Sequence, residues 1–509
     1  MSSTHSLWQE IEFSFTSTKS YENAYTDVEL WADFTCDDGT VMRRPGFWSG
    51  ENNWKIRFAP PTVGKWRISL FSNCEDQSFK FEDTFEVTNE ILGENLFYQK
   101  GFWSLPTGER NLKFRDGSSD LIVADTAWAL PWRATVEDVK LYAKDRRTKG
   151  FNAVLLMVVQ PDMGARGPRD RGADEGFAVG FEDLHEGHIN LLNPDYFDYL
   201  DSLISVLVEN EIVPVYSPLF FGFGWKGLGV IGPIVDSQEY ARFCRYIVAR
   251  YGARPAIYLA GADGTGVEAQ VEVGGKEFHK WDCYGQPTGI HYRPHIRPNA
   301  HQSAEWLDFQ WCQTGHGGEH IQERVADMWR NEPQRAIANG EPSYENTGVI
   351  GKSAGWWQGH EAWSNLCAGS TMGVVYGAAC LWGWRLHKDE LGHSDFFLAP
   401  GCGWREALDF EGATYVGLVG KILRGLPIAQ IQPSWSEAIS PRGLIVHGRL
   451  FIGYQENGGP LDVRGDGIPL NYRVIDPTSG REILRGRREK IESIIPDTGT
   501  GARVYICEA

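Results

Sequence analysis

Hydrophobic and polar residues alternate in the first part of the chain. Runs with a period of two lie at residues 28–34, 54–58 and 66–70. Turn-forming stretches separate them, such as Asp-Asp-Gly at 37–39 and Pro-Pro at 60–61. Short alternating strands joined by turns are typical of antiparallel sandwiches. We therefore predict a small β-sandwich over residues 1–92.

The pattern changes after about residue 95, where whole runs of consecutive residues become apolar. The runs are "LIVAD" (121–125), "FNAVLLMVV" (151–159), "IVPVYSPLF" (212–220), "AIYLAGAD" (256–263), "RAIANGE" (335–341) and "MGVVYGAACLW" (372–382). Continuous apolar strands are buried on both faces, which indicates a parallel sheet covered by helices. A helix is predicted between the first two runs, with Thr135 as its cap and Gly150 as its stop.

Polar residues gather just after these strands, as they do in a (β/α)8 TIM barrel. No glycine-rich phosphate-binding sequence follows the first strand, which argues against a dinucleotide-binding sheet. Alternation returns in "GLIVHGRLFIGYQ" (443–455). The predicted fold class is α/β, with a barrel over residues 93–428 and a second all-β sandwich over residues 429–509.

The charge balance excludes several partners. The chain of 509 residues has 49 basic and 67 acidic side chains, a net charge of −18, which disfavours nucleic acid and anionic lipid. The sequence contains no apolar stretch long enough to span a membrane. The amino terminus, "MSSTHSLWQEIEFSF", has neither the basic region nor the apolar core of a signal peptide. We expect a cytoplasmic protein and make no prediction of its oligomeric state.

The nine cysteines are scattered, without a CxxC pair or zinc-like spacing, so we expect nine free thiols. His316 and His320 are four residues apart, but "GHGGEH" contains two glycines that disfavour a helix presenting both histidines. We therefore predict no metal site and no cofactor.

Two carboxylates stand out at predicted strand ends. Glu341 lies between Gly340 and Pro342 in "RAIANGEPSYEN", which favours a stiff turn. Asp263 ends "AIYLAGAD". Catalytic residues of TIM barrels lie at the carboxyl ends of the strands. Two carboxylates there, with tryptophans and polar donors nearby, suit glycoside hydrolysis by an acid and a nucleophile or base.

Other polar and aromatic residues also follow predicted strands, and we expect them to bind substrate: Asp125, Trp128, Gln160, His316, Tyr376 and Trp382. In particular, we expect one pocket to be lined by Asp125, Asp263, His316, Glu341 and Tyr376. Structural alternatives stay open. Asp125 also suits a local backbone bond, His316 and Tyr376 suit hydrogen-bonded core positions, and the tryptophans suit core packing.

Six motifs occur in an order that resembles the apiosidase-like family of glycoside hydrolases: "LIVADTAWAL", "KGFNAVLLMVV", "LAGADGTG", "WLDFQWCQTGH", "ANGEPSYEN" and "MGVVYGAACLWGW". The flanks agree, since "YRVIDPTSGRE" resembles part of the sandwich often found behind such barrels. The resemblance implies that Glu341 is the nucleophile and Asp263 the acid/base. It also implies that Asp125 and Trp128 face substrate after strand one, and that His316 lies in the turn after strand six. One departure is Ala262, where the family would have glycine.

The resulting expectation is a retaining glycoside hydrolase that removes a terminal sugar, with a furanose such as apiose as one candidate, from a plant glycan or glycoside. Two alternatives stay open: a catalytically inactive carbohydrate-binding protein, and a pyranosidase or lyase on the same barrel. The charged loop at 164–188 is expected to shape the pocket, which limits what the sequence says about the substrate.

Overall fold

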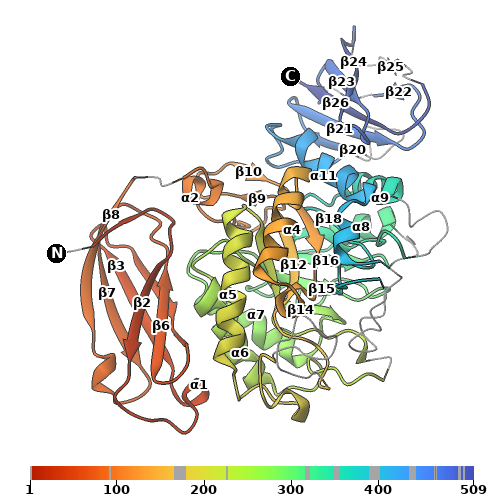
Figure 1. The fold of residues 1–509 in the computed structure, drawn as a ribbon. Helices are drawn as coiled ribbons and strands as arrows, with labels where there is room; N and C mark the ends of the chain where they lie inside the picture. The colour runs from red at the N-terminus through yellow and green to blue at the C-terminus, as the bar shows by residue number, and fades with distance from the viewer. Residues whose placement is uncertain are drawn as a thin grey trace.

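The chain folds into a central barrel with an N-terminal β-sheet domain beside it, at the left of Figure 1, and a C-terminal β-sheet domain at the top. The computed structural model describes residues 3–90, 93–164, 179–224, 227–315, 321–347, 355–388, 402–434, 443–463, 465, 467–490, 494–496 and 499–509. No helix in these ranges is long and apolar enough to cross a membrane.

The N-terminal domain is a sandwich of two sheets. One sheet has the order β1 (Thr4–Ser6), β8 (Glu82–Thr88), β7 (Gly64–Ser72), β3 (Leu30–Cys36) and β4 (Val41–Pro45), and the other has β2 (Ile11–Thr16), β6 (Asn53–Phe58) and β5 (Phe47–Trp48). Short helices α1 (Ala24–Asp27) and η1 (Gln77–Phe79) join strands. The inward residues of the alternating strands meet between the sheets, where the rings of Phe34 and Phe58 stack with centroids 3.9 Å apart.

The barrel consists of eight parallel strands: β11 (Ile122–Thr126), β12 (Ala153–Met157), β13 (Val213–Ser217), β14 (Ile257–Gly264), β15 (Thr288–Tyr292), β16 (Phe309–Gln313), β17 (Ala336–Glu341) and β18 (Gly373–Tyr376). β11 pairs with both β12 and β18. The first and last strands of the pairing order, β17 and β18, are linked by a bond from the Met372 N–H to the Ile337 carbonyl, at 3.3 Å. The sheet is therefore a nearly closed barrel, as predicted.

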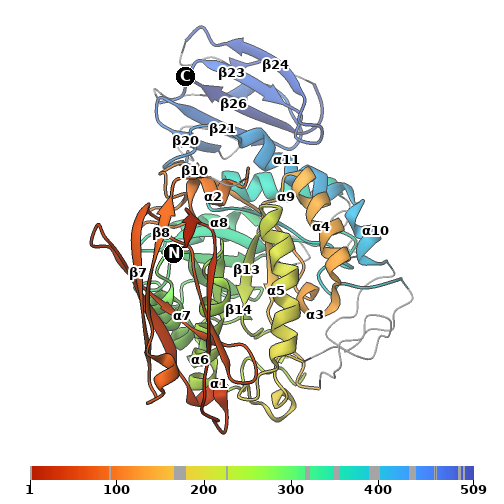
Figure 2. The same ribbon diagram turned by 60° about the vertical axis from the view of Figure 1, so that its left-hand side comes forward.

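Helices follow most strands and cover the barrel (Figures 1 and 2). They are α3 (Leu130–Arg133), α4 (Val136–Lys149), α5 (Pro194–Glu209), α6 (Ser237–Tyr251), α7 (Ala269–Trp281), α8 (Ile321–Trp329), α9 (Gly355–Cys367), α10 (Trp404–Leu408) and α11 (Glu411–Leu423). Short elements α2 (Leu96–Lys100), β9 (Leu112–Lys113) and β10 (Ser119–Asp120) precede the barrel, and η2 (Leu184–Glu186) precedes α5. As predicted, α4 begins after a Thr135 capping box and ends at Gly150, whose φ is 111°.

The C-terminal domain is an antiparallel sheet that lies beside α9 and α11 (Figure 1). Its order is β19 (Gln432–Pro433), β20 (Gly443–Val446), β21 (Leu450–Gln455), β26 (Arg503–Glu508), β23 (Asn471–Ile475) and β24 (Glu482–Arg487), with a separate pair of β22 (Leu461–Asp462) and β25 (Ile494–Ile495). The architecture confirms the predicted fold class, while the boundaries after residues 92 and 428 stay predictions.

The prediction of nine free thiols is wrong at two positions. Cys380 and Cys402 form a disulfide, with Cα atoms 5.8 Å apart, and the other seven cysteines are free. The two are separated by 22 residues, so their spacing in the sequence gave no sign of the pairing. Disulfides are typical of oxidising compartments. The cytoplasmic location therefore stays a prediction that cysteine usage does not support.

Candidate active site

Asp263 lies at the carboxyl end of β14, the fourth barrel strand, on an irregular backbone. The pairing of β14 with β15 passes from Ala262 to Gly264, so Asp263 is the bulged residue. Its φ of 57° is left-handed, which is uncommon for a residue other than glycine. A bulge of this kind redirects a side chain at the rim of a barrel.

Glu341 occupies the equivalent place at the end of β17, the seventh strand. The pairing of β16 with β17 passes from Asn339 to Glu341, which leaves Gly340 as the bulged residue. Gly340 is required for space rather than for an unusual φ, because a Cβ there would lie 2.7 Å from His291 Cδ2. The sequence predicted a stiff turn around Glu341, and the structure instead has the end of β17 there. The bulge at Gly340 allows this end of β17 to lie close to β15.

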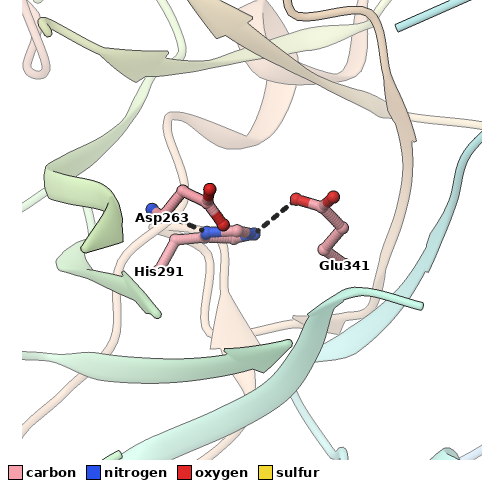
Figure 3. Close-up of side chains that lie close together, drawn as sticks. All are labelled: Asp263, His291 and Glu341. Atoms are coloured by element: carbon pink, nitrogen blue, oxygen red, sulfur yellow. Dashed lines mark hydrogen bonds and ion pairs between the residues drawn. The ribbon is translucent and has the colours of Figure 1, made fainter. Parts of the chain in front are cut away.

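The two carboxylates face the same space, with His291 of β15 between them (Figure 3). A carboxylate oxygen of Asp263, one of Glu341 and a ring nitrogen of His291 all lie within 4.8 Å of one another. All three residues are buried. This set could in principle hold a cation, and its two carboxylates are also the groups that the sequence predicted to act as a pair.

Burial and the negative charge of Asp263 raise the pKa of Glu341 well above its ordinary value. Hydrogen bonds from Tyr344 and Gln313 act in the opposite direction and favour the ionised form of Glu341. Two carboxylates this close and this buried favour a state with one proton between them, because ionisation of one opposes ionisation of the other.

Asp263 is covered by the loop that follows β13. A Cβ on Gly222 would lie only 2.0 Å from Asp263 Oδ2 and 2.6 Å from the ring of Phe220. Phe220 also forms a β-bridge with Ala262. The loop backbone therefore packs directly on the Asp263 carboxylate, and only glycine leaves room for it.

Asp125 and Tyr376, both predicted to face substrate, lie in a second polar cluster around Arg146. Asp125 Oδ2 accepts hydrogen bonds from Arg146 Nε at 2.5 Å and from Tyr142 at 3.0 Å. The Tyr376 hydroxyl donates to Glu345 at 2.7 Å, and the Arg146 guanidinium lies 5.8 Å from the Tyr376 ring. These bonds give both residues a structural role, and substrate binding by them stays a prediction.

The remaining predicted residues differ in their surroundings. Trp128 is buried and lies edge-on to His291, with centroids 5.6 Å apart, so it borders the carboxylate pair. Gln160 is buried beyond the end of β12, and Trp382 is part-exposed in the loop after β18, where its carbonyl accepts from the Ala129 N–H. His316 lies outside the described residues, as do residues 165–178 of the charged loop.

Sequence reasoning missed His291, Tyr344 and Glu361. Glu361 is a fully buried carboxylate on α9 that accepts from the Thr314 hydroxyl at 2.9 Å and from the Ser343 N–H at 3.0 Å. His291 belongs to a strand, "TGIHY", that is too short and too polar to stand out as an apolar run. The sequence identifies six apolar strands, and an eight-stranded barrel needs two more between residues 264 and 335. A count of the strands would therefore have indicated the strand that contains His291.

The sequence matches the family described as "Apiosidase-like, catalytic domain" over residues 106–430, more than half of the chain. The chain belongs to the apiosidase-like family. Residues 4–73 match a domain of unknown function, DUF5060. The resemblance expected from the motifs is thereby confirmed. A search of curated proteins gave no match.

Solved structures with a similar fold are glycoside hydrolases. A candidate glycoside hydrolase from Bacteroides vulgatus ATCC 8482 is 18% identical, with a TM-score of 0.73 and 100% of both chains covered. A glycoside hydrolase family 5 protein from the same organism is also 18% identical, with a TM-score of 0.67, covering 81% of this chain and 94% of the other. At such identities the likeness shows the fold alone.

The buried ion pair of Asp125 and Arg146 generates a stability prediction. Asp125→Asn keeps the shape of the side chain but removes one of the two carboxylates that pair with the fully buried guanidinium of Arg146, the other being Asp145 at 2.6 Å. We expect the free energy of unfolding to fall by about 1–3 kcal/mol, measured by chemical denaturation. Asp327→Asn is the control, because its ion pair with Arg330 is exposed and is worth about 0–1 kcal/mol. Unchanged stability of Asp125→Asn would contradict a structural role.

The close packing on Asp263 generates a second prediction. In Gly222→Ala the new methyl group must displace Asp263 Oδ2, and a shift of about 1 Å in a reacting group lowers turnover by about 100-fold. Turnover of an aryl glycoside and a crystal structure of the variant would measure both effects. Gly229→Ala, in the same loop with no atom within 4 Å of the added Cβ, should behave as wild type. Equal turnover in both variants would show that the close packing of Gly222 does not fix the position of Asp263.

Proposed function

We propose that this protein is a retaining glycoside hydrolase that removes a terminal sugar, a furanose such as apiose, from a plant glycan or glycoside. The observation that carries the proposal is the buried pair of Asp263 and Glu341, whose nearest oxygens lie within 4.8 Å. Retaining enzymes hold their carboxyl groups about 5–5.5 Å apart, whereas inverting enzymes need about 6.5–9.5 Å to admit a water molecule. The short separation favours retention.

In the proposed first step, Glu341 attacks the anomeric carbon as a carboxylate. The bond from that carbon to the leaving oxygen breaks, and Asp263 gives its proton to this oxygen. In the second step Asp263 removes a proton from water, and the water oxygen displaces Glu341 from the anomeric carbon. Both carboxyl groups then return to their starting states, so no cofactor is consumed.

The surroundings of the two groups support this division of roles. Tyr344 and Gln313 donate to Glu341 and favour its ionised form, as a nucleophile requires. Asp263 is buried, and the Gly222 backbone packs directly on its carboxylate. With the proton on Asp263, one of the two causes that raise the pKa of Glu341 is absent, and the hydrogen bonds from Tyr344 and Gln313 then act against burial alone.

Substrate contacts are proposed for residues around this pair. Trp128 borders His291, and the part-exposed ring of Trp382 offers an apolar surface of the kind on which sugars stack. Gln160 supplies an amide for hydroxyl groups. Asp125, Tyr376 and His316 stay candidates for sugar binding, with the first two requiring the Arg146 cluster to open.

The test of the function measures hydrolysis of chromogenic furanosides and pyranosides whose leaving groups differ in acidity. Glu341→Ala should lose turnover by several orders of magnitude for every leaving group. Asp263→Ala should lose most with poor leaving groups, since activated aryl glycosides need little protonation. Glu272→Ala is the control, because this carboxylate is exposed on α7 and pairs with Lys276.

Added azide separates the two roles. It enters the space left by either side chain, so rescue of Asp263→Ala should give a glycosyl azide of retained configuration, and rescue of Glu341→Ala one of inverted configuration. The opposite pattern would exchange the assignments. Hydrolysis of no glycoside, combined with tight sugar binding, would instead identify an inactive carbohydrate-binding barrel.

A further inference from the structure

His291 connects the two carboxylates of the candidate site (Figure 3). Its ring is fully buried on β15. The Asp263 backbone N–H donates to His291 Nδ1 at 3.3 Å, and Nε2 on the other side of the ring lies 3.6 Å from Glu341 Oε2. One imidazole thus touches the backbone of one proposed catalytic residue and faces the side chain of the other.

The contact with the Asp263 N–H points to one tautomer of His291, although the backbone carbonyls of Gly340 and His291 are further acceptors for the ring proton. A backbone N–H can only donate, so Nδ1 must offer its lone pair to Asp263. The proton of a neutral ring is then on Nε2, the atom that faces Glu341. Burial lowers the pKa of His291 to about 4, so the ring is neutral near pH 7 and Nε2 carries the only ring proton.

The fold is built to permit this contact. The bulge at Asp263 takes its N–H out of the ladder between β14 and β15, which frees it for the imidazole. Gly340 allows β17 to approach the ring, because any Cβ there would lie 2.7 Å from His291 Cδ2. The edge-on ring of Trp128 packs against the histidine. The irregular ends of β14 and β17 therefore both lie against the side chain of His291.

We propose that His291 is a positioning residue that links the acid/base to the nucleophile, donating its Nε2–H to ionised Glu341 while Nδ1 holds the Asp263 backbone. The roles of the two carboxylates rest on the proposed function, whereas the tautomer and the contact do not. The 3.6 Å separation exceeds an ordinary hydrogen bond, and we expect it to shorten in the reacting complex, as catalytic hydrogen bonds do. The other groups facing Glu341 are Asp263, Gln313 and Tyr344.

Two variants separate the two contacts. His291→Gln places an amide N–H near the position of Nε2 and retains a donor for Glu341. His291→Asn places its oxygen near the position of Nδ1 and retains only the acceptor for the Asp263 N–H. Loss of one hydrogen bond to a carboxylate raises its pKa by about one unit. The pKa of Glu341 is measured by NMR with ¹³C-labelled glutamate, and its signal is assigned by its absence in Glu341→Gln.

We expect the pKa of Glu341 to rise by about one unit in His291→Asn and to stay within a few tenths of a unit in His291→Gln. Equal shifts in both variants, or none in either, would overturn the proposal. If His291→Asn does not fold, the ¹⁵N shifts of the wild-type ring decide instead. A proton on Nε2 supports the proposal, and a proton on Nδ1 refutes it.

The readouts also separate this inference from the proposed function. The titration and the ring shifts need no substrate, so they remain valid if no glycoside is hydrolysed. Where turnover is measurable, kcat of His291→Asn should fall more than tenfold while His291→Gln keeps most of it, and KM should change little in both. A fall confined to KM would place His291 in substrate binding and would refute a positioning role.

Discussion

Mutual repulsion between two buried carboxylates is the constraint on which this site depends. With oxygens of Asp263 and Glu341 within 4.8 Å, ionisation of both is costly, which favours a state with one proton between them. Glycoside hydrolysis needs this state, because one group must donate a proton while the other attacks or stabilises the sugar. The rest of the barrel can be understood as a means of holding the pair at that distance.

The support extends from the strand ends to the C-terminal domain. Glu361 on α9 bonds the residues that follow β16 and β17, through Thr314 and Ser343, on either side of Glu341. The same helix contacts the C-terminal sheet, where Tyr454 bonds His360 at 2.9 Å and stacks on Trp363. Packing of the C-terminal sheet on α9 therefore stabilises the helix that fixes the end of β17. This gives a domain without proposed catalytic residues a part in the geometry of the site.

The sequence predicts the fold because burial leaves a strong pattern. The apolar runs correspond to six of the eight barrel strands, and the capped helix at 136–149 is found where Thr135 and Gly150 indicate it. The apolar pattern does not identify β15 and β16. These strands carry polar residues, including His291 and Gln313. Residues that face a polar site interrupt the pattern that identifies a strand.

The carboxylate pair was predictable from its position at strand ends, but its immediate partners were not. Asp125 lies near the carboxyl end of a strand as Asp263 does, yet it pairs with Arg146, 21 residues further along the chain. Such partners depend on helix packing, which periodicity does not specify. Bulges at Asp263 and Gly340 are equally hidden, because they follow from how neighbouring strands align.

The central claim is that the separation of Asp263 and Glu341 suits direct attack of Glu341 on the anomeric carbon, rather than attack by a water molecule. The most direct test is the anomeric configuration of the first-formed product, observed by ¹H NMR immediately after addition of enzyme to a furanoside that it hydrolyses. Two displacements at the anomeric carbon predict a product with the configuration of the substrate. A first product of opposite configuration would show that water attacks directly, and it would contradict the assignment of Glu341 as nucleophile.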